Sequence, residues 1–132
     1  IALGNTYYVG LMMTNEKDPE QKDWAKAIKV VFPTFENGGT HVNVSGVALA
    51  KNAPNRDNAV KLIQFLSSEN AQQVYAEQVF EYPVERGLAP SEIVSGFGKL
   101  TAHTLPLADI AKNRKAASEM VDRVGLDDGP AS

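Results

Sequence analysis

Apolar side chains recur at intervals of three and four along most of this chain, as they do on one face of a helix. A less regular alternation of valine and leucine over residues 40–50 is typical of a strand. The stretch 80–84 is expected to be extended, because a residue before proline disfavours helix. The apolar spacing, together with residues that start and stop helices, predicts helices over residues 7–13, 18–32, 56–66, 69–78, 91–96 and 107–124.

The predicted helix ends depend on capping residues and on residues that stop a helix. Thr6 can cap the first helix, and Asp18 followed by Pro19 is a typical helix start. Pro33 is expected to end the second helix, and Gly125 the last one. The chain is therefore expected to be helix-rich, with a few strands separated by helices.

The predicted strands are too few, and too far apart in the chain, to form an independent sheet. Residues 1–3 look like the tail of a buried strand, and the chain opens without methionine. These features indicate an α/β segment of a larger protein, so the absence of a leader sequence says nothing about export. If the segment folds alone, we expect self-association with a second copy, because unpaired sheet edges would otherwise face water.

Composition narrows the function classes. The 132 residues carry 13 basic and 16 acidic side chains, and a net charge of −3 gives no electrostatic reason to expect nucleic acid as a partner. No run of about 20 apolar residues predicts a membrane span. The chain has no cysteine, which excludes disulfides and zinc-thiolate sites within it. It shows no phosphate-binding glycine loop and no nucleophile elbow, so we do not expect an enzyme.

Tyr7 and Tyr8 are adjacent phenols in the first turn of a predicted helix. A phenolate oxygen is a hard anionic ligand and suits a hard, highly charged cation such as ferric iron. In an arbitrary protein, packing of two amphipathic rings is the commoner explanation. A phenol has a pKa of about 10, so its ionisation near neutral pH needs a strong local cation. Neighbouring helical side chains diverge by about 100 degrees, so both reach one ion only if the first turn is irregular.

The tyrosine pair stands in the motif GNTYY, residues 4–8, and FPTFENGGTHVNVSG follows at residues 32–46. Further on come KNAPN at 51–55, FEYPV at 80–84 and the stretch 116–125. These motifs resemble those of bacterial periplasmic ferric-iron-binding proteins, which are the solute-binding subunits of iron ABC transporters. The resemblance implies an α/β, type II periplasmic-binding-protein fold, two-lobed and similar to a transferrin lobe, of which only the C-terminal portion is present.

The resemblance also implies how the chain is divided between the two lobes. Residues 1–38 would end the second, C-terminal lobe, and residues 39–50 would be a crossover strand at the hinge. Residues 51–92 would then belong to the first, N-terminal lobe. The helices of residues 93–132 would return to the second lobe.

In the family that the chain resembles, an adjacent tyrosine pair provides two ferric ligands, and this pair matches Tyr7 and Tyr8. An asparagine two positions earlier supports a synergistic anion in some members and matches Asn5. The other ligands would lie upstream, in an N-terminal portion of the same protein that this chain lacks. The implied cargo is Fe(3+) with phosphate or carbonate as the candidate anion, the implied location is the periplasm, and the implied partner is an inner-membrane ABC permease.

Other residues with metal or acid–base chemistry have simpler explanations. Neither His41 nor His103 has a second histidine at metal-ligand spacing. We expect His41 to hydrogen-bond near the hinge and His103 to lie at the surface. Tyr82 is expected to pack, and the acidic pair 127–128 to lie in a solvated tail.

Three rival functions stay open at this point. A type II binding protein for a small anion or organic solute would use the tyrosines as a stacking platform. An enzyme would use one tyrosine as a general acid, but no base partner is visible in the chain. A structural helical module would bind no ligand.

Overall fold

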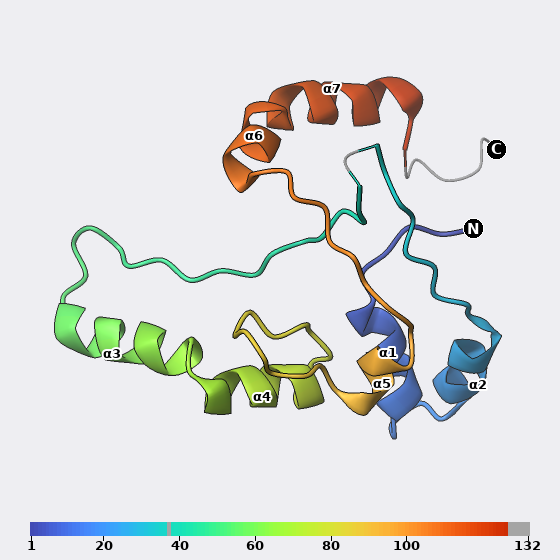
Figure 1. Cartoon of the computed structure of the whole chain (residues 1–132), viewed down its shortest axis with the longest axis horizontal. Helices are drawn as coiled ribbons and strands as arrows, with labels where there is room; N and C mark the ends of the chain where they lie inside the picture. Colours follow the sequence, from blue (N-terminus) through green and yellow to red (C-terminus); the bar gives the residue numbers. More distant parts are fainter. Residues whose placement is uncertain (37, 127–132) are drawn as a thin grey trace. The chain divides into compact units, whose positions relative to one another are not determined.

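The computed structural model describes residues 1–36 and 38–126, and its regular elements are helices (Figure 1). Within those residues, no helix is both long and apolar enough to cross a membrane. The helices are α1 (Tyr7–Thr14), α2 (Glu20–Ala27), α3 (Arg56–Leu66), α4 (Glu69–Gln78), α5 (Glu92–Ser95), α6 (Leu107–Lys112) and α7 (Arg114–Val124).

Helices α1, α3, α4 and α5 form where the sequence predicts them. α5 begins with a side-chain cap, in which Ser91 Oγ accepts a hydrogen bond from the Val94 N–H. The capping role predicted for Thr6 is wrong. Thr6 already has helical backbone angles, with φ −63° and ψ −30°, and its side chain makes no capping hydrogen bond. A capping residue needs an extended backbone to direct its oxygen at the first turn.

Helix α2 ends at Ala27, so the prediction that it continues to Pro33 is wrong. Ile28 turns extended, with φ −89° and ψ 130°. The following residues include Val30 and Val31, and β-branched side chains lose rotamer freedom in a helix and favour extended backbone. The apolar spacing that indicated a longer helix therefore continues into an extended segment.

The strand predicted over residues 40–50 is also wrong as a regular element. Among the described residues, Thr40 alone in this stretch pairs, through an isolated parallel bridge with Ala102. Val44 and Val47 are about half exposed, at 51% and 53%. A strand forms only where a second strand satisfies its backbone groups, and the described part of the chain supplies none beside these valines.

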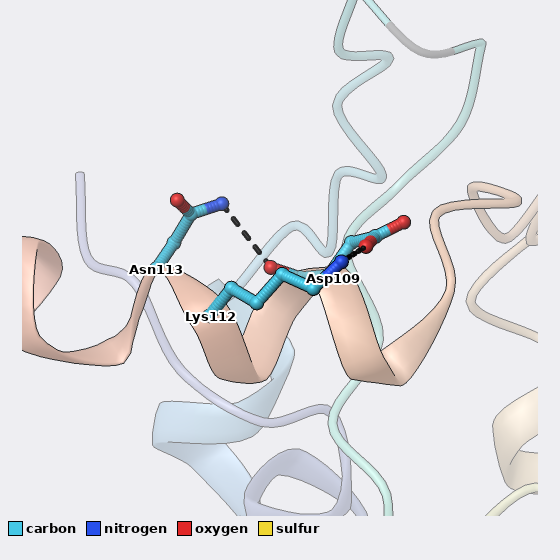
Figure 2. A network of polar contacts seen from close by, with 3 residues as sticks. All are labelled: Asp109, Lys112 and Asn113. Atoms are coloured by element: carbon cyan, nitrogen blue, oxygen red, sulfur yellow. Dashed lines mark hydrogen bonds and ion pairs between the residues drawn. The ribbon is translucent and has the colours of Figure 1, made fainter.

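The long closing helix predicted over residues 107–124 is broken at Asn113 into α6 and α7 (Figure 2). The Asn113 side-chain amide donates to the Asp109 carbonyl oxygen at 3.2 Å, and the Asn113 N–H donates to Ile110 O at 3.1 Å instead. An asparagine side chain thus takes the acceptor that the helical backbone would use. Gly125 ends α7 as predicted, in the left-handed conformation at φ 60°.

The chain divides into two compact units, each built from segments that are distant in sequence. The first unit comprises Ile1–Phe32 and Val42–Thr101, and the second comprises Pro33–His41 and Ala102–Ser132. In the second unit α6 contacts α7. These two units are not the two lobes predicted for the complete protein. The predicted division between lobes (residues 1–38, 39–50, 51–92 and 93–132) stays a prediction.

The buried core lies in the first unit, where α1 contacts both α2 and α5, and α3 contacts α4. Its apolar members are Ala25, Ala71, Ala76, Phe80 and Val94. Many large apolar side chains are exposed, among them Trp24, Leu62 and Phe65 at 52%, 55% and 57%. The self-association expected for the isolated chain would cover such surfaces, and it stays a prediction.

Candidate metal site

The two tyrosines begin α1, and their rings lie side by side. The centroids of the Tyr7 and Tyr8 rings are 4.4 Å apart, with the ring planes tilted by 47°. The first turn closes through two backbone hydrogen bonds. The Tyr8 N–H donates to Asn5 O at 3.3 Å, and the Val9 N–H donates to Thr6 O at 3.1 Å. These bonds span three residues instead of four, so the first turn is tighter than a regular α-helix. The two rings lie close together even though neighbouring side chains on a helix diverge by about 100 degrees.

Asn5 completes a small polar cluster with the tyrosines. Its Nδ2 donates to the Tyr7 hydroxyl oxygen at 3.4 Å. Asn5 and Tyr7 are half-buried, whereas Tyr8 is 55% exposed. The structure therefore brings together all three residues that the sequence analysis selected. Their roles as iron ligands and as an anion-binding residue stay predictions.

The surroundings of Tyr7 keep its hydroxyl protonated when no metal is bound. The polar interaction with the Tyr8 hydroxyl raises the pKa of Tyr7 most, and desolvation and the charges of Tyr8 and Glu81 raise it further. The Asn5 amide acts in the opposite direction. A cation at this site must therefore displace a proton from Tyr7.

A segment distant in sequence is fixed against α1. Phe80 is 5% exposed and packs on Gly10, where an added Cβ would lie only 2.4 Å from the Phe80 Cγ. Phe80 also has φ +59°, which costs about 1 kcal/mol or more for a residue with a Cβ. Burial of the ring offsets this strain. The contact could not be found from sequence spacing, and the only local signal is the missing side chain at Gly10.

The residue after Phe80 carries a carboxylate that the sequence analysis did not select. Glu81 is half-buried, and its Oε1 accepts a hydrogen bond from Ser45 Oγ at 3.1 Å. Tyr82 follows, and its hydroxyl is buried without a hydrogen-bond partner among the described residues. Desolvation raises the pKa of Tyr82. These features agree with the packing role expected for Tyr82.

The two histidines meet in the second unit, where His41 Nδ1 lies 2.8 Å from His103 Nε2. The hydrogen-bonding role expected for His41 is confirmed. His103 was expected to lie at the surface, and this is only partly correct, because its ring is half-buried and hydrogen-bonded to His41. The Leu105 N–H donates to His103 Nδ1 at 3.2 Å. His103 Nδ1 is therefore unprotonated, and a neutral His103 carries its proton on Nε2 and donates it to His41.

This hydrogen-bond network disfavours a metal at the histidine pair. A metal on His103 Nε2 would move the ring proton to Nδ1, where it would face the Leu105 N–H. No group of three His, Cys, Asp or Glu side chains that could hold a metal occurs in the part of the chain that is described. The acidic pair 127–128 lies outside the described residues.

The tautomer of His103 can be checked directly. We expect two-bond proton–nitrogen correlations in the complete protein, labelled at histidine, to show His103 protonated on Nε2, because the Leu105 N–H occupies Nδ1. A His41→Ala variant should keep the same tautomer, since Leu105 alone is sufficient to fix it. A His103 ring protonated on Nδ1 in either sample would contradict this assignment.

Comparison with curated proteins adds independent information. No protein-family model matches the chain. Iron uptake protein A1 of Synechocystis sp. is 42% identical over 125 residues, which are 95% of this chain and 34% of that protein. Iron uptake protein A2 of the same organism is 32% identical over 127 residues, covering 95% of this chain and 36% of that protein.

Solved structures agree with the sequence comparison. A Bordetella ferric binding protein superposes with a TM-score of 0.81 at 54% identity, over 94% of this chain and 39% of that one. By sequence and by fold, this chain belongs with the ferric-binding proteins. A second ferric-binding protein, from Campylobacter jejuni, superposes with a TM-score of 0.86 at 33% identity. A Trichodesmium protein (IdiA, FutA) in complex with iron and citrate ligands gives 0.83 at 34% identity, over 94% of this chain and 39% of that one.

The ferric-binding proteins have the type II periplasmic-binding fold, and the chain matches only its own portion of them. The predicted α/β fold class is thereby confirmed. The chain spans about a third of the curated relatives' length, which agrees with the prediction that it is one portion of a ferric-binding protein. The described residues form no sheet, and a strand without a partner strand in the same chain forms no ladder.

Proposed function

We propose that the complete protein binds ferric iron between two lobes for uptake, with the phenolate oxygens of Tyr7 and Tyr8 as two of its ligands. The observation that carries this proposal is the side-by-side arrangement of the two rings at the start of α1, with centroids 4.4 Å apart, in a chain that belongs with the ferric-binding proteins. Two phenolates are hard anionic ligands, and a ferric ion is a hard cation.

Asn5 is proposed to hold a synergistic anion, phosphate or carbonate, next to the iron. Its Nδ2 donates to the Tyr7 oxygen in the structure. Once that oxygen is bound to iron, the amide can donate to an anion that completes the coordination. The remaining ligands would come from the portion of the protein outside this chain.

The proposed activity is capture and delivery without chemical conversion of the cargo. Closure of the lobes would shield the ion from hydrolysis, and an inner-membrane ABC permease would receive it in the periplasm. In this arrangement residues 1–38 and 93–132 belong to the second lobe, 51–92 to the first, and 39–50 cross the hinge. The iron-uptake and ferric-binding relatives support the proposal.

Titration of the complete protein with ferric nitrilotriacetate tests this function. A visible tyrosinate-to-iron charge-transfer band that saturates at one iron per protein is expected. A folded sample without this band would refute ligation by tyrosine. Binding of a small anion or organic solute that persists in strong chelator would then favour the tyrosines as a stacking platform.

Iron binding is expected to weaken as the pH falls. The pKa of Tyr7 is raised in the metal-free site, so the phenol is protonated at neutral pH and loses its proton when iron binds. Each displaced proton makes affinity rise about tenfold per pH unit. Two protons per iron are expected in a weakly buffered titration of the complete protein, after correction for the chelator. One proton is expected in a Tyr8→Phe variant, and no proton release in the unsubstituted protein would contradict the scheme.

A further inference from the structure

A short junction joins the two sequence segments of the second unit. Thr40 forms its parallel bridge with Ala102, and the His103 N–H donates to Thr40 O at 3.0 Å. The two backbones approach so closely that a Cβ on Gly39 would lie 2.4 Å from the His103 backbone nitrogen. The hydrogen bond between the rings of His41 and His103 lies directly beside this backbone contact. The junction therefore has a backbone part and a histidine part.

The segment that carries His41 is folded onto itself. The Phe35 N–H donates to Gly39 O at 3.0 Å, and Thr40 Oγ1 donates to Pro33 O at 2.9 Å. His41 thus follows directly on a turn that is closed by its own hydrogen bonds. This turn limits the positions that the His41 ring can take.

Both ring nitrogens of the pair that lack a proton are already occupied. The Leu105 N–H donates to His103 Nδ1 at 3.2 Å, and His103 Nε2 donates across 2.8 Å to His41 Nδ1. A neutral His41 then carries its own proton on Nε2. An added proton on His103 Nδ1 would face the Leu105 N–H, and one on His41 Nδ1 would face the proton of His103 Nε2. The closed pair therefore has no free site for a further proton.

No charged side chain is bonded to either ring within the described residues. The charged residues of the described part of the second unit are Glu36, Asp109, Lys112, Arg114, Lys115, Glu119, Asp122 and Arg123. Asp109 pairs with Lys112 at 2.7 Å and Glu119 with Lys115 at 3.8 Å. Neither an ion pair nor a hydrogen bond from any of these residues reaches the rings of His41 or His103. A protonated ring thus gains no bonded carboxylate in place of the hydrogen bond that it loses.

We propose that His41 and His103 form a pH-sensitive switch, which is closed while both rings are neutral and opens on protonation. A histidine ring free of such bonds has a pKa of about 6.5, so the open rings take up protons as the pH falls below that value. The closed form is therefore fully stable above about pH 6.5 and is lost as the pH falls, because only the open form gains protons. Two positively charged rings at this distance also repel each other. Opening leaves the backbone contact alone to join the two segments, and it does not depend on the proposed iron ligands.

Hydrogen exchange of backbone amides in the complete, metal-free protein tests the switch. The His103 N–H donates to Thr40 O beside the rings. Its protection, corrected for the intrinsic effect of pH on exchange, is expected to fall about tenfold between about pH 7.5 and about pH 5, which corresponds to the loss of one or two neutral hydrogen bonds. The Val79 N–H donates to Tyr75 O at 3.1 Å in the first unit and is the control, which should keep its protection.

The double variant His41→Asn/His103→Gln identifies the titrating groups, because it replaces both rings by side-chain amides that do not titrate. Protection of the amide at position 103 should then be the same at both pH values. A loss of protection in the unsubstituted protein that is absent from the double variant supports the switch. A loss that persists in the double variant would assign the titration to another group and overturn the proposal. Unchanged protection of His103 in the unsubstituted protein, or an equal loss at Val79 through general unfolding, would also overturn it.

Discussion

Ferric binding is expected to disappear when Tyr7 and Tyr8 are both replaced by phenylalanine in the complete protein. The two substitutions keep the rings, which lie side by side at the start of α1, and remove only the two hydroxyl groups. Loss of a group that merely supports a metal ligand costs about 10- to 100-fold in affinity. Loss of one direct anionic ligand should therefore cost about 100-fold or more, and loss of both should leave no measurable binding.

Single variants and a matched control make this result specific. Tyr7→Phe and Tyr8→Phe should each weaken ferric binding strongly and change the charge-transfer band. Tyr75→Phe removes the same hydroxyl from an exposed position on α4 and should leave the band and the affinity unchanged. Affinity that is unchanged in both single variants would rule out the tyrosines as ligands, whatever the complete protein binds.

The second large effect is expected at Gly10, which is buried in α1. The Cβ of an alanine there would lie 2.4 Å from the Phe80 Cγ and 2.8 Å from its Cβ. These atoms lie at the base of the ring, so rotation of a flexible chain end cannot relieve the clash. Overpacking of this kind costs about 1–3 kcal/mol. Alanine also recovers up to about 1 kcal/mol of helix preference, so a net destabilisation at the lower part of that range is expected.

Chemical denaturation of the complete protein measures the effect of Gly10→Ala as a lower midpoint. Gly46→Ala is the matched control, because an added Cβ there meets nothing within 4 Å. Phe80→Leu makes room at the contact, so the combination with Gly10→Ala should cost less than the sum of the two single variants. Additive costs would show that Gly10 and Phe80 do not interact.

Local signals in the sequence were sufficient for most helices and for the tyrosine pair. The turn at Gly4 and Asn5 located the start of α1, although the capping role of Thr6 was wrong, and the chemistry of two adjacent phenols identified the candidate ligands before their geometry was known. Local spacing was insufficient where extended backbone follows a helix without a change in apolar pattern, as after Ala27. It also failed at Asn113, where one side-chain hydrogen bond breaks a continuous apolar face.

Residues brought together from distant parts of the sequence could not be predicted. Ser45 and Glu81 are 36 positions apart, and neither residue alone indicates that the two side chains meet. The neighbouring Phe80 packs on Gly10, 70 positions earlier in the chain, and that contact likewise has no signal in the local sequence. The strand expected at 40–50 failed for a related reason, because strand formation depends on a partner and not on the strand's own residues.

The discontinuous second unit has a consequence during protein synthesis. Its two parts are joined by the bridge between Thr40 and Ala102 and by the hydrogen bond between His41 and His103, which are 62 positions apart. A ribosome adds about 5–20 residues per second, so the segment Pro33–His41 has to wait several seconds for its partner to emerge. Throughout that interval the Thr40 carbonyl oxygen lacks the His103 N–H that donates to it in the folded unit, and the segment is available to chaperones and proteases. The order of translation, and not only the final contacts, therefore determines when this unit is protected.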